Sequence, residues 1–171
     1  PALELSYITI KAAYANSNLG IKPSSNTAKI SFMPAYVSNI SASSETEKYI
    51  SPVNKTIIPI NITNYGNGET TVNVNVENQS ENLNISTDPE TITLAVGKTR
   101  QINLIVIPGE NFENETINLK LIPKSTSKAN VAEEYLQGTS IPLSITVINN
   151  SPKKEKTGGI SGELIIIAVI V

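Results

Sequence analysis

The sequence of 171 residues contains neither cysteine nor histidine. Zinc fingers, thiol nucleophiles, haem and iron–sulfur ligation, and His-based catalytic triads depend on these residues, so the composition excludes them. Asp88 is the one aspartate among fifteen acidic residues, which argues against carboxylate-rich calcium loops. The sequence therefore offers no ligand set for a metal or cofactor, and no cofactor is expected.

Aromatic residues and net charge are also scarce. Tryptophan is absent and aromatic residues make up 5% of the chain, so a platform for stacking sugars or bases is poorly supplied. Thirteen basic and fifteen acidic side chains leave a formal charge of −2. Binding of nucleic acid needs a clustered basic excess, and so no nucleic-acid partner is expected.

The residues that are abundant favour β-structure. The chain has 25 isoleucines, 20 asparagines and 34 serines and threonines. Isoleucine and threonine are enriched in strands, whereas asparagine and serine are enriched in the turns that join them. With 39% apolar residues, the chain can form the core of about one domain.

Residues 50–149 alternate between apolar and polar side chains with a period of two, the pattern of half-buried strands. Strands are predicted over 56–63, 70–78, 91–97, 101–107, 115–123 and 141–149, with a shorter one around Leu83 and Ile85. Seven short strands in this length predict an all-β fold, an antiparallel immunoglobulin-like β-sandwich. Its expected core includes Ile60, Val74, Leu94, Leu104, Leu119 and Ile145.

Local signals refine this prediction. Glycines at 64–69, 97–100 and 108–111 predict tight turns, and the first of these stretches combines glycine with asparagine, residues that tolerate positive φ angles. Pro59 lacks a backbone donor, which suggests an edge strand or a bulge at that position. Residues 129–136 show helical spacing and predict one or two helical turns inside a long loop.

The N-terminal segment, residues 1–49, is predicted to be a strand pair that belongs to a preceding β module. Strands are expected over 3–12 and 28–37, separated by the turn-rich stretch 17–25. Two strands alone are marginally stable in water. They are interpreted either as the remainder of a preceding module or as extra strands added to the sandwich.

The C-terminal segment predicts a membrane anchor. Residues 150–163 are rich in glycine, lysine and serine and are typical of a flexible linker. Residues 164–171 form an unbroken apolar run, which is interpreted as the start of a transmembrane helix, with a buried strand as the alternative. The β domain is expected outside, although Lys153, Lys154 and Lys156 favour the opposite orientation unless they only solvate the linker.

Several short motifs occur in a fixed order in the central segment. Residues 50–56 (ISPVNKT) lead to 60–67 (INITNYGN), followed by Asp88-Pro89-Glu90, the turn at 97–99 and a strand that ends at Pro108. In this order they resemble the NEW3-type immunoglobulin-like modules of archaeal and bacterial surface proteins, including S-layer-related proteins. Modules of this type are also found attached to glycosidases. The resemblance covers residues 50–149, and its P-G-x-Y motif is matched loosely by residues 108–112. It implies a non-catalytic extracellular module, often with a C-terminal membrane anchor, and it transfers no site residues.

Sequons for N-glycosylation are the most frequent motif. They begin at Asn39, Asn54, Asn61, Asn78, Asn84 and Asn114, and a seventh at Asn149 is weakened by the following Pro152. Alternation places Asn61 outward, between the inward-facing Ile60 and Ile62. On an exterior domain, several of these asparagines are expected to carry glycans.

Acidic residues are the only candidates for catalysis, namely the pair Glu133-Glu134 and the group Glu110, Glu113 and Glu115. No basic partner for them is evident in the sequence, so solvated loop charges are the favoured interpretation and no enzyme activity is expected. Tyr49, Tyr65 and Phe112 are interpreted as core or turn anchors.

Three functional hypotheses follow. The first is a membrane-anchored cell-surface module of an envelope or adhesive kind, whose partners are the membrane, other envelope proteins or surface glycans. The second is an accessory module of an extracellular glycosidase or protease whose catalytic domain lies upstream. The third is a filament subunit, in which the apolar tail or an N-terminal strand enters a neighbour's open sandwich.

Overall fold

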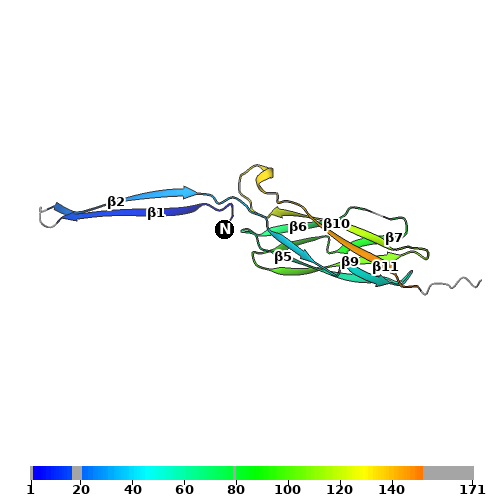
Figure 1. The fold of residues 1–171 in the computed structure, drawn as a ribbon. Helices are drawn as coiled ribbons and strands as arrows, with labels where there is room; N and C mark the ends of the chain where they lie inside the picture. Colours follow the sequence, from blue (N-terminus) through cyan, green and yellow to red (C-terminus); the bar gives the residue numbers. More distant parts are fainter. Residues whose placement is uncertain (1, 17–20, 79, 152–171) are drawn as a thin grey trace, which may run out of the picture.

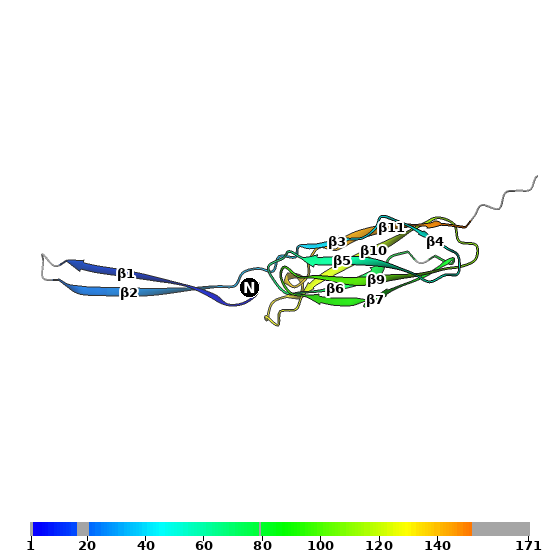
Figure 2. The ribbon, with the colours of Figure 1, turned by 90° about the horizontal axis from the view of Figure 1, so that it is seen from below.

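The computed structural model describes residues 2–16, 21–78 and 80–151, and nearly all of its regular structure is β-strand (Figure 1). Eleven strands form three sheets, of which two pack face to face as a sandwich. The third is a two-stranded ribbon that projects from one end of the sandwich (Figure 2). The strands are β1 (Ser6–Asn16), β2 (Ile21–Phe32), β3 (Ile40–Ser43), β4 (Glu47–Ile50), β5 (Thr56–Asn64), β6 (Thr70–Val76), β7 (Leu83–Asp88), β8 (Thr91–Leu94), β9 (Thr99–Pro108), β10 (Glu115–Ser125) and β11 (Ile141–Asn149).

The sandwich consists of a four-stranded sheet with the order β3-β5-β9-β7 and a five-stranded sheet with the order β4-β11-β10-β6-β8. All pairings in the two sheets are antiparallel except β4 with β11, which is parallel. The predicted all-β sandwich is therefore confirmed.

The core lies between the two sheets and is formed by isoleucine, leucine and valine on the inward face of each strand. All six positions predicted for it are buried, with exposed fractions of 5% or less: Ile60, Val74, Leu94, Leu104, Leu119 and Ile145. Complete burial of one such side chain contributes about 1.5–3 kcal/mol. Phe112 closes the core at the end opposite the ribbon and is 1% exposed.

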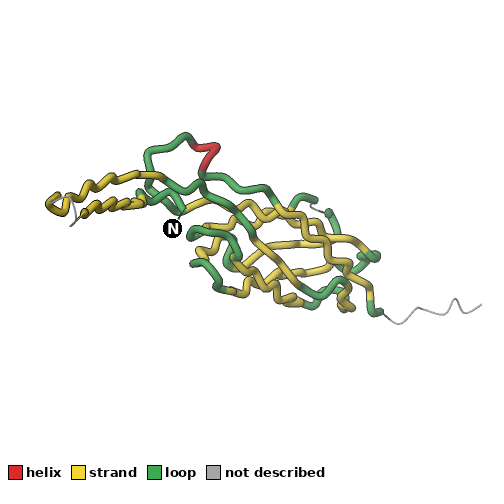
Figure 3. The backbone as a smooth tube through the Cα atoms, turned by 60° about the vertical axis from the view of Figure 1, so that its left-hand side comes forward, coloured by secondary structure: helices red, strands yellow, loops and turns green. Residues whose placement is uncertain are grey.

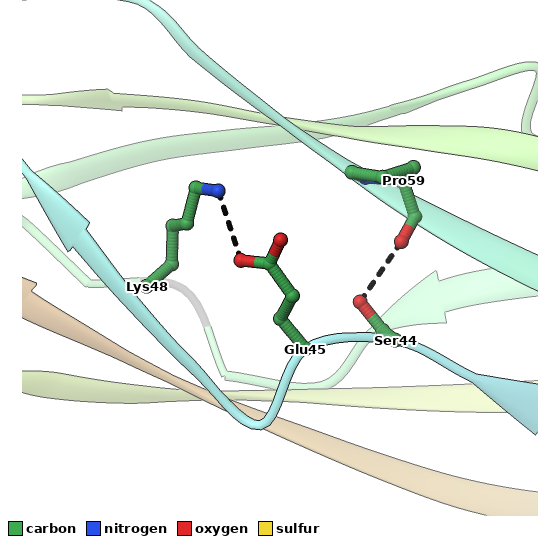
Figure 4. A network of polar contacts seen from close by, with 4 residues as sticks. All are labelled: Ser44, Glu45, Lys48 and Pro59. Carbon is green, nitrogen blue, oxygen red and sulfur yellow. Dashed lines mark hydrogen bonds and ion pairs between the residues drawn. The ribbon is translucent and has the colours of Figure 1, made fainter.

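The sandwich begins at Ile40, earlier than the boundary predicted at residue 50. β3 joins the four-stranded sheet and β4 joins the five-stranded sheet, so the chain changes sheet between Ser43 and Glu47. At this crossing, the Ser44 hydroxyl donates to the Pro59 carbonyl oxygen at 2.9 Å, and Lys48 pairs with Glu45 at 2.8 Å (Figure 4). Each strand is four residues long, too short for alternation to reveal it.

Pro59 does not lie on an edge strand, because β5 is flanked by both β3 and β9. The pairing with β3, however, extends only from Asn64 to Asn61. Pro59 lies beyond it, and its carbonyl oxygen on that side accepts the hydroxyl of Ser44. The backbone nitrogen of Pro59 therefore faces no strand that would need a hydrogen bond from it. A proline on an edge strand is tolerated for the same reason.

The turn after β5 is determined by close packing and not by φ. Neither Gly66 nor Gly68 uses the positive φ that glycine tolerates, whereas Gly97 has a φ of 73°. A Cβ atom at Gly66 would lie 2.6 Å from the carbonyl oxygen of Val37, so only glycine fits there. Asn64, which is completely buried, receives the Gly66 N–H on Oδ1 at 2.9 Å.

A second change of sheet occurs between β7 and β8. β7 pairs with β9, whereas β8 pairs with β6 in the other sheet. The cis peptide bond between Asp88 and Pro89 lies at this crossing. The edge strands of the sandwich are therefore four to six residues long. They leave part of β5 and part of β11 without a ladder partner on one side.

The predicted helical turn is present as a short 3-10 helix, η2 (Glu133–Tyr135), in the loop between β10 and β11. This loop lies beside the base of the ribbon (Figure 3). Val131 and Tyr135 stay partly or largely exposed, which explains why the apolar spacing did not extend into a longer helix.

The ribbon pairs β1 with β2 from Ser6–Phe32 outward, and neither strand joins the sandwich sheets. Of the two interpretations of the N-terminal segment, added sandwich strands are therefore wrong. The base of the ribbon is anchored by buried Ala2 and Leu3, and the Leu3 N–H donates to the Pro34 carbonyl at 2.8 Å. Asn67 holds the connection to the sandwich, accepting from the Val37 N–H at 2.8 Å.

The predicted linker, apart from residues 150 and 151, and the predicted membrane segment 164–171 lie outside the described residues. Within the described ranges, no helix has the length and apolar character needed to cross a membrane.

Candidate glycan-acceptor sites

The six asparagines that begin the predicted sequons are all solvent exposed: Asn39, Asn54, Asn61, Asn78, Asn84 and Asn114. Exposure of the amide is the first requirement for an N-linked glycan. Asn61 faces outward, as alternation predicts, since Ile60 and Ile62 on either side are completely buried.

Four of the six lie at the end of the sandwich opposite the ribbon. Asn54 precedes β5, Asn78 follows β6, Asn114 precedes β10 and Asn84 is the second residue of β7. These strand ends meet where β11 finishes, as Figure 1 shows. The sequence gives no sign of this clustering, because only the topology brings the loops together.

The outer face of the four-stranded sheet carries Asn61 and Asn84 around an apolar patch. Ile57 lies opposite Ile105, and Ile107 lies opposite Asn84. Ile57 and Ile107 are 50% and 39% exposed. The patch accounts for the apolar second face of β9, and a glycan on Asn84 would lie beside it.

Asn78 differs from the other acceptors, because its amide is engaged with the backbone of β10. Nδ2 donates to the Thr116 carbonyl at 2.9 Å, and Oδ1 accepts from the Asn118 N–H at 2.8 Å. Both contacts lie on one strand, so the donated hydrogen is on the same side of the amide as Oδ1. In a trans amide, a sugar attached to Nδ2 replaces the hydrogen on the same side as Oδ1. Asn78 therefore cannot carry a glycan and also donate to the Thr116 carbonyl in this way.

Asn149 is also a structural residue. It is partly buried at the end of β11, and its Nδ2 donates to the Phe112 carbonyl at 2.8 Å. Its backbone N–H donates to Oδ1 of Asn114 at 2.9 Å, which leaves the Nδ2 atom of Asn114 directed elsewhere. Asn114 therefore keeps the atom that would carry a glycan.

The outer face of the five-stranded sheet is covered by hydrogen-bonded pairs of short polar side chains. Such cross-strand pairs stabilise a sheet by about 0.2–1 kcal/mol each and leave its face polar. The pairs are Thr71–Thr93 at 3.2 Å, Thr91–Asn73 at 2.6 Å, Thr116–Thr146 at 3.3 Å and Ser144–Asn118 at 2.8 Å.

The acidic residues considered for catalysis do not form a site. Glu133 pairs with Lys124, and this hydrogen bond lowers the pKa of Glu133 below its ordinary value of 4.5. Glu115 accepts from the Ser80 hydroxyl at 3.0 Å. Across the described ranges, no group of three or more carboxylates is placed to hold a metal ion.

The aromatic residues divide into two groups. Phe112 is a core residue, as predicted, but Tyr49 and Tyr65 are 63% and 64% exposed. Tyr49 is on edge strand β4 and is not the anchor that was predicted. Its inward neighbour Ile50 fills that role and is 2% exposed.

An open groove of about 350 Å³ lies at the base of the ribbon. Its lining is mainly apolar and includes Leu3, Met33, Ala35, Tyr36, Val131 and Tyr135. Tyr36 is held in place because its hydroxyl is 2.9 Å from the hydroxyl of Thr70.

No protein-family model and no curated protein matches this sequence. Among solved structures, the chain is similar to a PapD-like domain of human CEP192, with a TM-score of 0.48, 8% identity, and coverage of 67% of this chain and 87% of that domain. It is also similar to Escherichia coli α2-macroglobulin, with a TM-score of 0.47, 14% identity, and coverage of 66% and 17%. A third similarity is to the E. coli chaperone DraB, with a TM-score of 0.42, 14% identity, and coverage of 68% and 56%. No function is transferred from these proteins.

Proposed function

We propose that this chain is a non-catalytic, glycosylated β-sandwich module of a cell surface, anchored in the membrane through its C-terminal segment. The observation that carries the proposal is the exposure of all six predicted acceptor asparagines. An exposed acceptor asparagine can carry an N-linked glycan, a bulky and solubilising surface group, on a domain that faces the exterior.

The arrangement of the acceptors supports the proposed orientation. Asn54, Asn84 and Asn114 surround the end of the sandwich from which the chain continues toward residue 152. Glycans there would lie between the sandwich and the membrane. The apolar run at 164–171 and the NEW3-type resemblance support the same proposal.

The polar covering of the five-stranded sheet supports a non-catalytic role. Its outer face is occupied by threonine, serine and asparagine pairs that bond to one another, as between Thr116 and Thr146. Side chains that satisfy each other in this way stabilise the module and leave few groups directed at a substrate.

The test is protease accessibility on intact cells that express the full-length protein. We expect external protease to remove the sandwich domain from intact cells, and glycosidase treatment to reduce its apparent mass. If the domain is cut only after the cells are permeabilised, it lies inside and the proposal is wrong.

A further inference from the structure

The two faces of the β1–β2 ribbon have different chemistry. Because strand partners share a face, the pairs Ser6–Phe32, Ile8–Ile30, Ile10–Ala28 and Ala12–Asn26 lie on one side of the ribbon. The pairs Tyr7–Ser31, Thr9–Lys29, Lys11–Thr27 and Ala13–Ser25 lie on the other side. We call the first side the apolar face and the second side the polar face.

The apolar face has no covering within the described part of the chain. Ile8, Ile10, Ile30 and Phe32 are each between 44% and 52% exposed. The ribbon extends away from the sandwich in two views that differ by 90° (Figures 1 and 2). A two-stranded ribbon is only marginally stable in water, so burial of this face would stabilise it.

We propose that the apolar face packs against the apolar face of a second copy of this chain, with the two ribbons antiparallel. The twofold axis passes near the Ile10–Ala28 pair, at the middle of the ribbon. Each copy presents the same surface to the other, which makes the contact isologous and closed. This association goes beyond the proposed function and does not depend on a membrane.

The sizes of the side chains suit this arrangement. The pair nearer the sandwich, Ile8–Ile30, is large, whereas Ala12 and Ala28 lie nearer the middle and the tip. Antiparallel stacking about this axis places the Ile8–Ile30 pair of one copy over the Ala12–Asn26 pair of the other. Large residues opposite small ones let two packed sheets interdigitate.

The charges select the same face. Lys11 and Lys29 both lie on the polar face, and the Lys29 ammonium lies over the Tyr7 ring, 3.7 Å from its centre. Stacking through the polar faces would bring four like charges together. Stacking through the apolar faces keeps the lysines in solvent on opposite sides of the dimer, where they are screened.

Insertion of the ribbon into the interior of a neighbouring copy is not supported. In the described ranges, the sandwich core is closed: Ile58, Ile62 and Leu104 are completely buried, and no buried side-chain polar atom lacks a partner. A groove of about 390 Å³ lies between β6 and β7. Its lining is mainly polar, so it offers little contact to the apolar face of the ribbon: Val74, Asn75, Val76, Ile85, Ser86, Thr87 and Glu90. The two-ribbon contact requires no opening of the fold.

The area of the contact predicts its strength. An eleven-residue strand is about 36 Å long, and one face of two strands covers about 400 Å². Two copies would bury about 800 Å², below the 1,200 Å² typical of stable complexes. The dimer should therefore be weak in solution and well populated where copies are concentrated on a surface.

Cysteine cross-linking tests the proposal, since the chain has no thiol of its own. Ala28→Cys places a thiol on the apolar face, and Thr27→Cys places one on the polar face beside it. Each full-length variant, with a C-terminal histidine tag, is treated with a bismaleimide that spans about 10 Å, the spacing of packed sheets. The reaction is run in free solution and on phosphatidylcholine vesicles that contain a nickel-chelating lipid.

On vesicles, we expect about tenfold more dimer from Ala28→Cys than from Thr27→Cys, and a smaller excess in solution. Adding Ile8→Asn to Ala28→Cys should remove the excess, whereas adding Thr9→Asn should retain it. Because both changes weaken the β-propensity of β1, the comparison separates loss of the contact from loss of the ribbon. Equal yields from the two cysteines on vesicles, or equal effects of the two asparagines, would overturn the proposal.

Discussion

The side-chain amide of Asn64 donates a hydrogen bond to the carbonyl oxygen of Leu94 over 3.0 Å, and it joins the two sheets of the sandwich. Asn64 ends β5 in the four-stranded sheet, whereas Leu94 ends β8 in the five-stranded sheet. The same amide donates to the Gly68 carbonyl at 2.9 Å. One buried side chain therefore holds the ribbon end of the sandwich together.

Replacement of Asn64 by alanine should strongly destabilise the domain. The change leaves the Leu94 and Gly68 carbonyls and the Gly66 N–H without their partner, and we expect a loss of about 2–3 kcal/mol in the free energy of unfolding. Urea denaturation followed by circular dichroism measures this loss. Asn61→Ala is the control and should change stability by less than about 0.5 kcal/mol, because Asn61 is exposed. Similar losses for the two variants would contradict the role of Asn64.

Gly66→Ala should cost about 2 kcal/mol or more, since its Cβ would lie 2.6 Å from the Val37 carbonyl oxygen and force the chain apart. Gly109 provides the matched control. A Cβ there would meet the Asn82 carbonyl oxygen at 3.4 Å, an ordinary contact. Gly109→Ala should therefore be neutral or slightly stabilising in the same denaturation experiment. A tolerated alanine at position 66 would show that the turn can move away from Val37.

Asn78→Gln should lower stability by about 1–2 kcal/mol, because the longer side chain cannot keep both bonds to the backbone of β10. Asn84→Gln removes a sequon in the same way, but it should leave the free energy of unfolding nearly unchanged. The melting temperatures of the two unglycosylated variants give the comparison. Equal melting temperatures would show that the Asn78 pairing contributes nothing.

The same geometry predicts unequal glycosylation. Asn78 should have the lowest occupancy among the sequons at the end opposite the ribbon, whereas Asn54 and Asn114 should be occupied. Mass spectrometry of peptides from the glycosylated protein measures each site. Full occupancy at Asn78 would require its amide to leave β10.

Val53→Asn should stabilise the domain by about 1 kcal/mol, because Val53 has a φ of 54°, a conformation that β-branched residues adopt at a cost and asparagine tolerates. Val53 is 59% exposed, so little buried surface is lost. Val96 is similarly exposed at 52% and is not among the residues with positive φ. Val96→Asn should therefore give no such gain in melting temperature.

The pair of Glu133 with Lys124 should make a small, salt-sensitive contribution to stability that depends on pH. Because the folded-state pKa of Glu133 is lowered, the contribution is present above pH 4.5 and is lost as the pH falls through the folded-state value. The difference in unfolding free energy between the protein and Glu133→Gln should shrink over this range. Glu134→Gln is the control, and an equal pH dependence for both variants would rule out the Lys124 pair as its cause.

The strands of the sandwich were predictable because one face of each strand is exposed to solvent and the other is buried in the core, so polar and apolar residues alternate along it. Alternation identified β5, β6, β9, β10 and β11 and the inward position of residues such as Ile60 and Leu119. It missed β3 and β4, which are too short to show a period. Pattern also could not reveal which short strands change sheet, since that depends on pairing between distant segments.

The acceptor sites were predictable as motifs, but their differences were not. The sequence treats Asn78 and Asn114 alike, and only the contacts with Thr116 and Asn118 distinguish them. Asn64 looked like a turn former, whereas it is a buried link between sheets. The role of a polar residue that bonds to partners distant in the sequence cannot be identified from its neighbours in the sequence.

The parallel pairing of β4 with β11 has a mechanical consequence. The chain enters the sandwich at the ribbon end and leaves it at the opposite end, so a pull between Val37 and Ser151 draws these two strands in opposite directions along their length. The pairs from Thr146–Glu47 to Asn149–Ile50 would then share the load and rupture together, and would not open one after another. In single-molecule pulling, Lys48→Pro, which removes a backbone donor from β4, should lower the rupture force far more than Lys98→Pro in the turn before β9. A module with this geometry would resist a pulling force that is applied through its ribbon.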